Sequence, residues 1–185
     1  MSDTEKDLLS GQTVGIIGAG SMGGSIARGL VESGALPGSS VFVCDHNPGK
    51  LEALASEAGV RTFQTSAELL AAKPGIVVLA VKPQVLAPVL AQHAADLDGV
   101  LVVSIAAGVT LATLEAALPG SRAVRVMPNL PVSVRSGASA VTGGASASAT
   151  DVETVRALFA TLGSAKVMRE DQLDAEGAVV GCAPA

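Results

Sequence analysis

Short apolar runs alternate with helical patterns along almost the whole of this 185-residue chain, and this alternation constrains the fold most strongly. The runs are rich in valine, isoleucine and leucine, which is typical of strands buried on both faces of a sheet. The segments between them place apolar residues at helical spacing, and several of them end at a glycine. Such alternation predicts an α/β fold with a doubly wound, mainly parallel sheet of about eight strands and right-handed crossovers.

The expected elements follow directly from these patterns. The strands are expected at residues 13–17, 41–44, 60–63, 76–81, 100–105, 123–127, 139–142 and 165–168. The helices are expected at residues 21–34, 50–58, 66–71, 85–95, 111–118 and 151–162. Ser66 is expected to cap the third helix, and Thr150 or Asp151 the last. Pro83 should break the start of the fourth helix, and Pro88 should strain it.

Composition excludes several classes of protein. Hydrophobic residues make up 49% of the chain and aromatic residues 2%, so the chain can pack a core that must be largely aliphatic. A net charge of −5 without a basic run gives no nucleic-acid surface, and no apolar stretch is long enough to cross a membrane. The polar start is neither a signal nor a transit peptide, and Cys44 and Cys182 are expected to be reduced thiols rather than metal ligands. No metal site is expected. Reduced thiols indicate a cytoplasmic location, which is therefore expected.

One turn carries a pattern with a known mechanism. Residues 18–23 (GAGSMG) have the form G-x-G-x-x-G, and they follow the first expected strand and open the first helix. Gly18 would permit the tight turn, Gly20 would let a pyrophosphate approach the backbone, and Gly23 would let helix and strand pack closely. The helix N-terminus would then present N–H groups to the phosphates. The alternative is a glycine-rich turn without a ligand, but the context favours a Rossmann-type dinucleotide-binding domain.

Asp45 bears on the choice between NAD and NADP. It follows the second expected strand, about twenty residues after the last glycine of the turn. A carboxylate there can accept from both ribose hydroxyls of NAD, and it would repel the 2′-phosphate of NADP. The other interpretation is a capping role in the turn from Asp45 to Pro48. The sequence therefore favours NAD weakly, and His46 is interpreted as a contact to solvent or to the adenine edge.

Three further segments go beyond a generic fold of this class. Residues 79–83 (LAVKP), 103–110 (VSIAAGVT) and 125–131 (RVMPNLP) close the fourth, fifth and sixth expected strands, and Gly137-Ala138 follows. In this order and spacing, and with the glycine turn, they resemble pyrroline-5-carboxylate reductase over residues 13–175. The resemblance implies an NAD(P)H-dependent oxidoreductase of proline biosynthesis that reduces the C=N bond of 1-pyrroline-5-carboxylate to L-proline.

The family's cofactor contacts carry over by position. Residues 17–22 would form the phosphate turn, Asn47 would lie near the adenosine ribose, and Ser66 stands where the family usually has a cofactor-contacting asparagine. Residues 81–82 would line the nicotinamide ribose, and residues 105–107 would border the nicotinamide ring. The positions expected to contact the cofactor are Ile17, Gly18, Ala19, Gly20, Ser21, Met22, Gly23, Asp45, Asn47, Ser66, Ala80, Val81, Lys82, Pro83, Ile105, Ala106, Ala107 and Asn129.

The chain departs from the family pattern in two places. Leu130 stands where the family has a threonine, so a hydroxyl is lost. After Asp174-Ala175 the family continues with a Thr-Gly and a Ser-Gly-Ser-Gly-Pro-Ala run, of which residues 176–185 keep only a trace. The family's helical domain, which holds the substrate loop and the dimer interface, is expected to be missing, so no catalytic residue is named.

The predicted organisation has three parts. Residues 1–11 are expected to be a flexible leader, residues 12–170 the dinucleotide-binding domain, and residues 171–185 the start of a truncated C-terminal helical domain. The expected partners are a nicotinamide dinucleotide and, in the full-length family, an imine substrate and a second copy of the chain. Two alternatives stay open. One is a truncated or degenerate paralogue that binds a dinucleotide without catalysis, and the other is a related dehydrogenase with another substrate.

Overall fold

The computed structural model describes residues 2–173 of the chain. The strands are β1 (Val14–Ile17), β2 (Val41–Cys44), β3 (Arg61–Phe63), β4 (Ile76–Leu79), β5 (Leu101–Ser104), β6 (Arg122–Pro128), β7 (Gly137–Gly143) and β8 (Gly163–Val167). The α-helices are α1 (Asp3–Leu9), α2 (Ser21–Glu32), α3 (Pro48–Ala58), α4 (Ser66–Ala71), α5 (Pro83–His93), α6 (Leu111–Ala117) and α7 (Ala149–Ala160). The short 3₁₀ turns are η1 (Gly38–Ser40) and η2 (Leu130–Val134).

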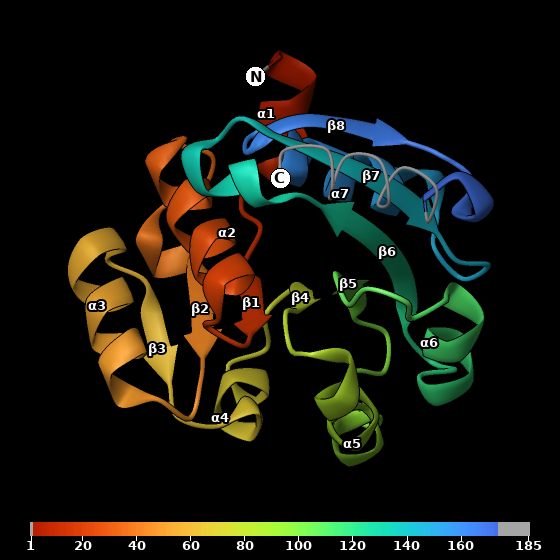
Figure 1. Ribbon diagram of the computed structural model, residues 1–185, viewed down its shortest axis with the longest axis horizontal. Helices are drawn as coiled ribbons and strands as arrows, with labels where there is room; N and C mark the ends of the chain where they lie inside the picture. The colour runs from red at the N-terminus through yellow and green to blue at the C-terminus, as the bar shows by residue number, and fades with distance from the viewer. Residues whose placement is uncertain (1, 174–185) are drawn as a thin grey trace.

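All eight strands belong to one sheet, in the order β3-β2-β1-β4-β5-β6-β7-β8 (Figure 1). Neighbouring strands are parallel except β6 and β7, which form an antiparallel pair. The chain winds outward on one side of β1 and on the other side of β4, so the direction of winding changes between these two strands. Open α/β sheets bind ligands at such a switch point, beyond the carboxyl ends of the strands. The predicted Rossmann-type α/β fold is confirmed.

The core lies on both faces of the sheet because successive strand residues point to opposite sides. On one face, Ile16 packs in a cluster with Ile26 of α2 and Leu158 of α7. On the other face, Val77 packs in a cluster with Leu86 of α5. Burying each such aliphatic side chain contributes about 1.5–3 kcal/mol, and both layers together hold the strand ends in fixed positions.

The start of the chain corrects the prediction of a flexible leader over residues 1–11. Residues 3–9 form α1, which begins with a capping box between Ser2 and Glu5. Leu9 is buried in the core, and Glu5 pairs with Arg156 of α7 across 2.8 Å. The hydrogen bond from Arg156 is the main reason that the pKa of Glu5 falls to about 2. The segment folds as a helix because it is anchored by one apolar residue and one ion pair.

Two predicted caps are also wrong. Thr65 caps α4 by accepting from the backbone N–H three residues on, and Ser66 is the first residue of the helix. Ser148 caps α7, while Asp151 completes its capping box and Thr150 lies inside the helix. Both stretches are dense in serine, threonine and aspartate, and each of these residues favours the N-cap position. The composition therefore locates the helix start only to within a few residues.

Helix α5 begins two residues earlier than predicted, at Pro83 rather than at residue 85. Proline is favoured at the first position of a helix because its missing N–H has no partner there in any case. Pro88 lies inside the helix, as the sequence indicated. Among residues 2–173, no helix is both long enough and apolar enough to cross a membrane.

Candidate functional site

The turn between β1 and α2 places its three glycines in different surroundings. Gly18 has a φ of +106°, and a Cβ there would lie 2.7 Å from the carbonyl oxygen of Ala80. A Cβ at Gly23 would collide with the carbonyl oxygen of Gly18. A Cβ at Gly20 would meet no atom of residues 2–173 within 4 Å, apart from those of its two chain neighbours. The fold itself thus requires glycine at two positions, while Gly20 keeps its backbone open to an approaching ligand.

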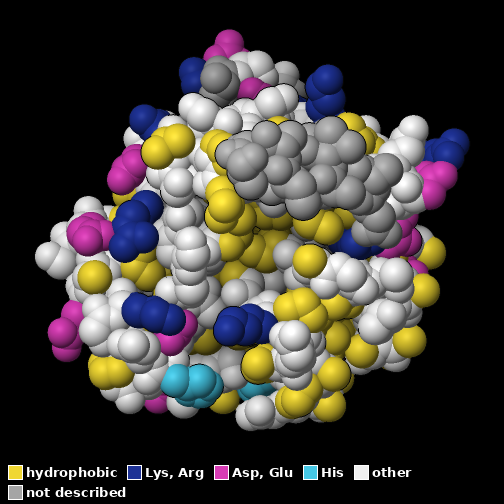
Figure 2. Space-filling model, in the orientation of Figure 1, with side chains coloured by type: hydrophobic (Ala, Val, Ile, Leu, Met, Phe, Trp, Pro, Cys, Tyr) yellow, Lys and Arg dark blue, Asp and Glu magenta, His cyan; other side chains and the backbone are white. Residues whose placement is uncertain are grey.

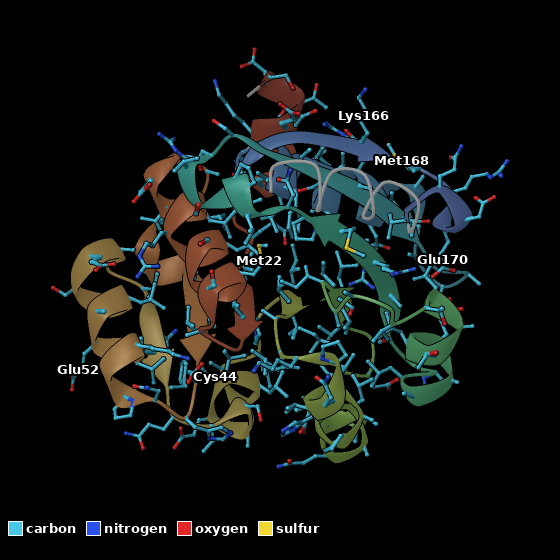
Figure 3. The ribbon with its side chains drawn as sticks, viewed as in Figure 1. Met22, Cys44, Glu52, Lys166, Met168 and Glu170 are labelled. Atoms are coloured by element: carbon cyan, nitrogen blue, oxygen red, sulfur yellow. The ribbon has the colours of Figure 1, made fainter. Side chains whose placement is uncertain are left out.

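Helix α2 offers its N-terminus to the same open space. Its N-cap is Gly20, and no side chain of residues 2–173 caps the first N–H groups of the helix. Such N–H groups and the helix dipole favour binding of an anion such as a phosphate or a carboxylate. Of the other turn residues, Ala19 and Ser21 flank Gly20, and the Met22 side chain packs on the core. Figure 3 shows Met22 on the inner side of α2, where its side chain is half-buried.

Asp45 links the loop after β2 to this turn. Its Oδ2 accepts from the backbone N–H of Ala19 at 2.8 Å, and its Oδ1 from that of Asn47 at 2.9 Å. Lys50 Nζ lies 3.6 Å from Oδ2. Burial alone would raise the pKa of Asp45, but the hydrogen bonds from Asn47 and Ala19 and the charge of Lys50 outweigh it and lower the pKa. A carboxylate has about four lone-pair sites, so Asp45 keeps some for further donors.

The capping role in this loop falls to Asn47 and not to Asp45. Asn47 is the N-cap of α3, and its side chain accepts from the backbone N–H groups of Gly49 and Lys50 at 3.0 and 3.3 Å. The Asn47 side-chain oxygen is therefore engaged within the protein, whereas its amide N–H₂ group remains a donor.

A mostly apolar pocket lies beside the switch point. Ile17, Val81 and Val85 contribute apolar walls, and Asp45 and Ser66 contribute polar groups. Gly18, His46 and Gln64 line it as well. The pocket thus brings together five of the residues predicted from the sequence, which are Ile17, Gly18, Asp45, Ser66 and Val81.

Cys44 also lines this pocket and is a buried free thiol. Burial is the main reason that its pKa is raised to about 11, so the thiol stays protonated at neutral pH. A protonated thiol is a poor nucleophile and a poor metal ligand, which agrees with the predicted structural role. The other cysteine, Cys182, lies outside the described residues.

Ser66 belongs to a hydrogen-bonded series that sequence reasoning missed. Its Oγ lies 2.7 Å from Nε2 of His93, and Nδ1 of His93 lies 3.0 Å from Oδ2 of Asp96. His93 is only 2% exposed, at the end of α5. The spacing of His93 and Asp96 suits neighbours along a helical turn, but nothing in the sequence connects them with a serine 27 residues earlier.

The remaining predicted positions lie at the ends of β4 and β5. Ala80 donates from its N–H to Ile17 at 2.9 Å, and Ile105 to Leu79 at 3.3 Å, which aligns the ends of the three central strands. Lys82 is exposed and Pro83 begins α5. The positions after β5 are a half-buried Ile105, a buried Ala106 and an exposed Ala107. The space-filling view shows hydrophobic side chains in a central hollow near these strand ends, with lysine and arginine side chains along its lower edge (Figure 2).

Asn129 has a structural task that the sequence did not reveal. Its Oδ1 accepts from the N–H of Ala138 at 2.8 Å, and its own N–H donates to the carbonyl oxygen of Ala138 at 3.2 Å. These bonds close the connection between β6 and β7. Because these two bonds use the Asn129 side-chain oxygen and backbone N–H, a contact from Asn129 to a ligand would have to use its side-chain N–H₂ group.

Comparison with known proteins agrees with this geometry. The family model described as NADP oxidoreductase, coenzyme F420-dependent, matches residues 13–108, which contain the glycine turn, Asp45 and the ends of β4 and β5. The chain belongs to this family. Over 179 residues it is 35% identical to the pyrroline-5-carboxylate reductase of Methanosarcina acetivorans. This alignment covers 96% of the chain and 66% of that protein.

The chain is also similar to solved structures of the same enzymes. A pyrroline-5-carboxylate reductase from Coxiella burnetii superposes with a TM-score of 0.88 at 31% identity, covering 94% of the chain and 65% of that structure. The enzyme from Plasmodium falciparum, solved with NADP bound, superposes with a TM-score of 0.84 at 25% identity. This match covers 94% of the chain and 64% of that structure. The predicted resemblance to pyrroline-5-carboxylate reductases is confirmed. The chain spans slightly under two thirds of the length of these relatives.

Proposed function

We propose that residues 12–170 form a binding domain for NAD or NADP. The observation that carries this proposal is the open backbone of Gly20, set between two glycines that the fold itself requires and facing the N-terminus of α2. The pyrophosphate would lie there, because uncapped N–H groups favour an anion. Asp45 would accept from the adenosine ribose, and the pocket bordered by Ser66 would receive the adenine base. Lys82 and the residues after β5 would border the nicotinamide half.

We propose that this domain serves the reduction of 1-pyrroline-5-carboxylate to L-proline. The relatives that cover most of this chain are named for that activity. When bound, the reduced nicotinamide supplies the hydride for the C=N carbon. The chain's own residues hold the cofactor and orient it. The predicted start of a C-terminal domain for the substrate and the dimer interface, at residues 171–185, lies outside the described residues from residue 174 on. Assembly as a homo-oligomer and a cytoplasmic location remain predictions.

A second candidate is dinucleotide binding without catalysis. Residues 105–107, assigned to the nicotinamide ring, are isoleucine and two alanines and offer no side-chain proton donor. Reduction of an imine also requires a proton, which a positioned acid usually delivers. Oxidation of NADH or NADPH that depends on 1-pyrroline-5-carboxylate, by a protein that contains this domain, would favour the enzyme over this candidate.

The binding proposal is tested by calorimetric titration of the chain with NADH and with NADPH. In Gly20→Ala the added methyl group occupies the space assigned to the pyrophosphate. We expect this variant to bind at least about tenfold more weakly, a loss of about 1.4 kcal/mol. Its thermal unfolding should be nearly unchanged, because the new Cβ makes no contact within 4 Å in the described part of the chain beyond its own neighbours.

Gly75→Ala is the matched control. Gly75 lies at the amino end of β4, away from the ligand edge, and a Cβ there would make only ordinary contacts of 3.5 Å or more. This variant should bind both dinucleotides as the unmutated chain does. Equal weakening by the two variants, or no binding by the unmutated chain at millimolar cofactor, would contradict the proposal.

A further inference from the structure

Three polar side chains connect the proposed adenine pocket to the protein surface. Ser66 lines the pocket, and its Oγ lies 2.7 Å from Nε2 of the buried His93. On the other side of the ring, Nδ1 lies 3.0 Å from Oδ2 of Asp96, whose side chain is 56% exposed. We call Ser66, His93 and Asp96 the polar triad. Its three members come from α4, from the end of α5 and from the turn that follows α5.

The directions of the two hydrogen bonds follow from the chemistry of the groups. An ionised carboxylate can only accept, so the bond between His93 and Asp96 requires a proton on Nδ1. A neutral imidazole has a single N–H, which leaves Nε2 of His93 as an acceptor. The Ser66 hydroxyl must then donate its only proton to Nε2. The Ser66 oxygen is left with lone pairs alone for any group in the pocket.

We propose that the polar triad makes Ser66 a hydrogen-bond acceptor in the base pocket and so selects a purine with an exocyclic amine over one with a carbonyl at that position. This inference rests on the proposed function, because it takes the pocket as the site of the dinucleotide's base. His93 and Asp96 act as positioning residues, since they fix the Ser66 proton without lining the pocket. The same order of groups activates serine nucleophiles in hydrolases, but an adenine base offers no acyl group for attack.

The selectivity arises from a match of donors and acceptors. The 6-amino group of adenine can donate to Ser66, whereas the 6-oxo group of hypoxanthine would face it with a second acceptor. Two acceptors that face one another leave both groups without a hydrogen bond. In a pocket with apolar walls, such a mismatch lowers affinity by about tenfold.

The test compares NADH with its 6-oxo analogue, nicotinamide hypoxanthine dinucleotide in reduced form. Both are titrated calorimetrically into the 185-residue chain at pH 8. The unmutated chain should bind NADH about tenfold more tightly than the analogue. Ser66→Ala should reduce this preference to about twofold or less, because the acceptor that rejects the carbonyl is gone.

Asp96→Ala tests the positioning role without touching the pocket. It removes the acceptor that holds the ring proton on Nδ1, so the proton can move to Nε2, which would then donate to Ser66. The Ser66 hydroxyl becomes free to donate into the pocket, and the preference for NADH should fall towards twofold. Asp98→Ala makes the same chemical change at an exposed position two residues on, and it should keep the preference of about tenfold.

The outcomes separate this inference from the proposed function. Equal affinity of the unmutated chain for the two dinucleotides would overturn the inference alone. An unchanged preference in Asp96→Ala would also overturn it, since an exposed residue with a purely structural role would leave base selectivity unaltered. Absence of binding for both dinucleotides would overturn the proposed function and this inference together.

Discussion

At the scale of single residues, Asp45 combines two tasks. Its carboxylate holds the loop after β2 against the glycine turn through the N–H groups of Ala19 and Asn47. Because these bonds and Lys50 lower its pKa against the effect of burial, the carboxylate is charged at neutral pH. A fixed negative charge beside the proposed ribose site would attract hydroxyl donors and repel a phosphate.

Asp45 leads to a prediction about cofactor preference. The unmutated chain should bind NADH at least as tightly as NADPH, and Asp45→Asn should raise the relative affinity for NADPH by about tenfold, because repulsion of the 2′-phosphate is removed. Calorimetric titration with both dinucleotides gives the ratio. Glu52→Gln is the control, since Glu52 is an exposed acid on the outer side of α3 (Figure 3). A clear NADPH preference in the unmutated chain would contradict this role of Asp45.

At the scale of elements, α1 shows how a polar segment is held in place. Leu9 anchors its end in the core, and Glu5 pairs with Arg156, which also pairs with Glu153 within α7. The pKa of Glu5, lowered to about 2 chiefly by the Arg156 hydrogen bond, ties the docking of α1 to pH. A lowered carboxyl pKa contributes stability that is present above the ordinary value and is lost as pH falls through the folded value.

The prediction at this scale is a pH-dependent loss of stability. Glu5→Gln should lower the free energy of unfolding at pH 7 by about 1 kcal/mol, as for a partly exposed ion pair. The difference from the unmutated chain should shrink as pH falls from about 4.5 towards about 2. Urea titrations at a series of pH values measure it. Asp3→Asn, at a side chain that is 98% exposed, should have little effect at any pH, and a Glu5→Gln effect independent of pH would argue against the ion pair.

At the scale of the whole molecule, features that depend on residues close together in the sequence could be predicted, and features that depend on residues far apart in the sequence could not. The strand at 76–79 (IVVL) and the turn at 18–23 could be predicted because their patterns are local and each residue type has a steric reason. Helix α1 was missed although its capping box between Ser2 and Glu5 is a local signal. Its docking could not be predicted, since its ion-pair partner Arg156 lies 151 residues away. The polar triad was missed for the same reason, because the contact between Ser66 and His93 depends on how α4 and α5 pack on the sheet.

The whole molecule also carries a prediction about activity. The 185-residue chain alone should not reduce 1-pyrroline-5-carboxylate at a useful rate, because orienting the imine contributes several kcal/mol to hydride transfer. The residues described here supply the proposed cofactor site, and the substrate site is proposed to lie in the additional length of the relatives. Absorbance at 340 nm follows NADH or NADPH in the assay. Turnover of about 1 s⁻¹ or more would contradict this division of tasks.

The most direct test of dinucleotide binding is a crystal structure of the chain grown with NADH or NADPH. The account predicts the pyrophosphate against Gly20 at the start of α2, the adenosine ribose within hydrogen-bond distance of Asp45, and the adenine in the pocket beside Ser66. A dinucleotide bound at another edge of the sheet, or an adenine outside that pocket, would contradict it.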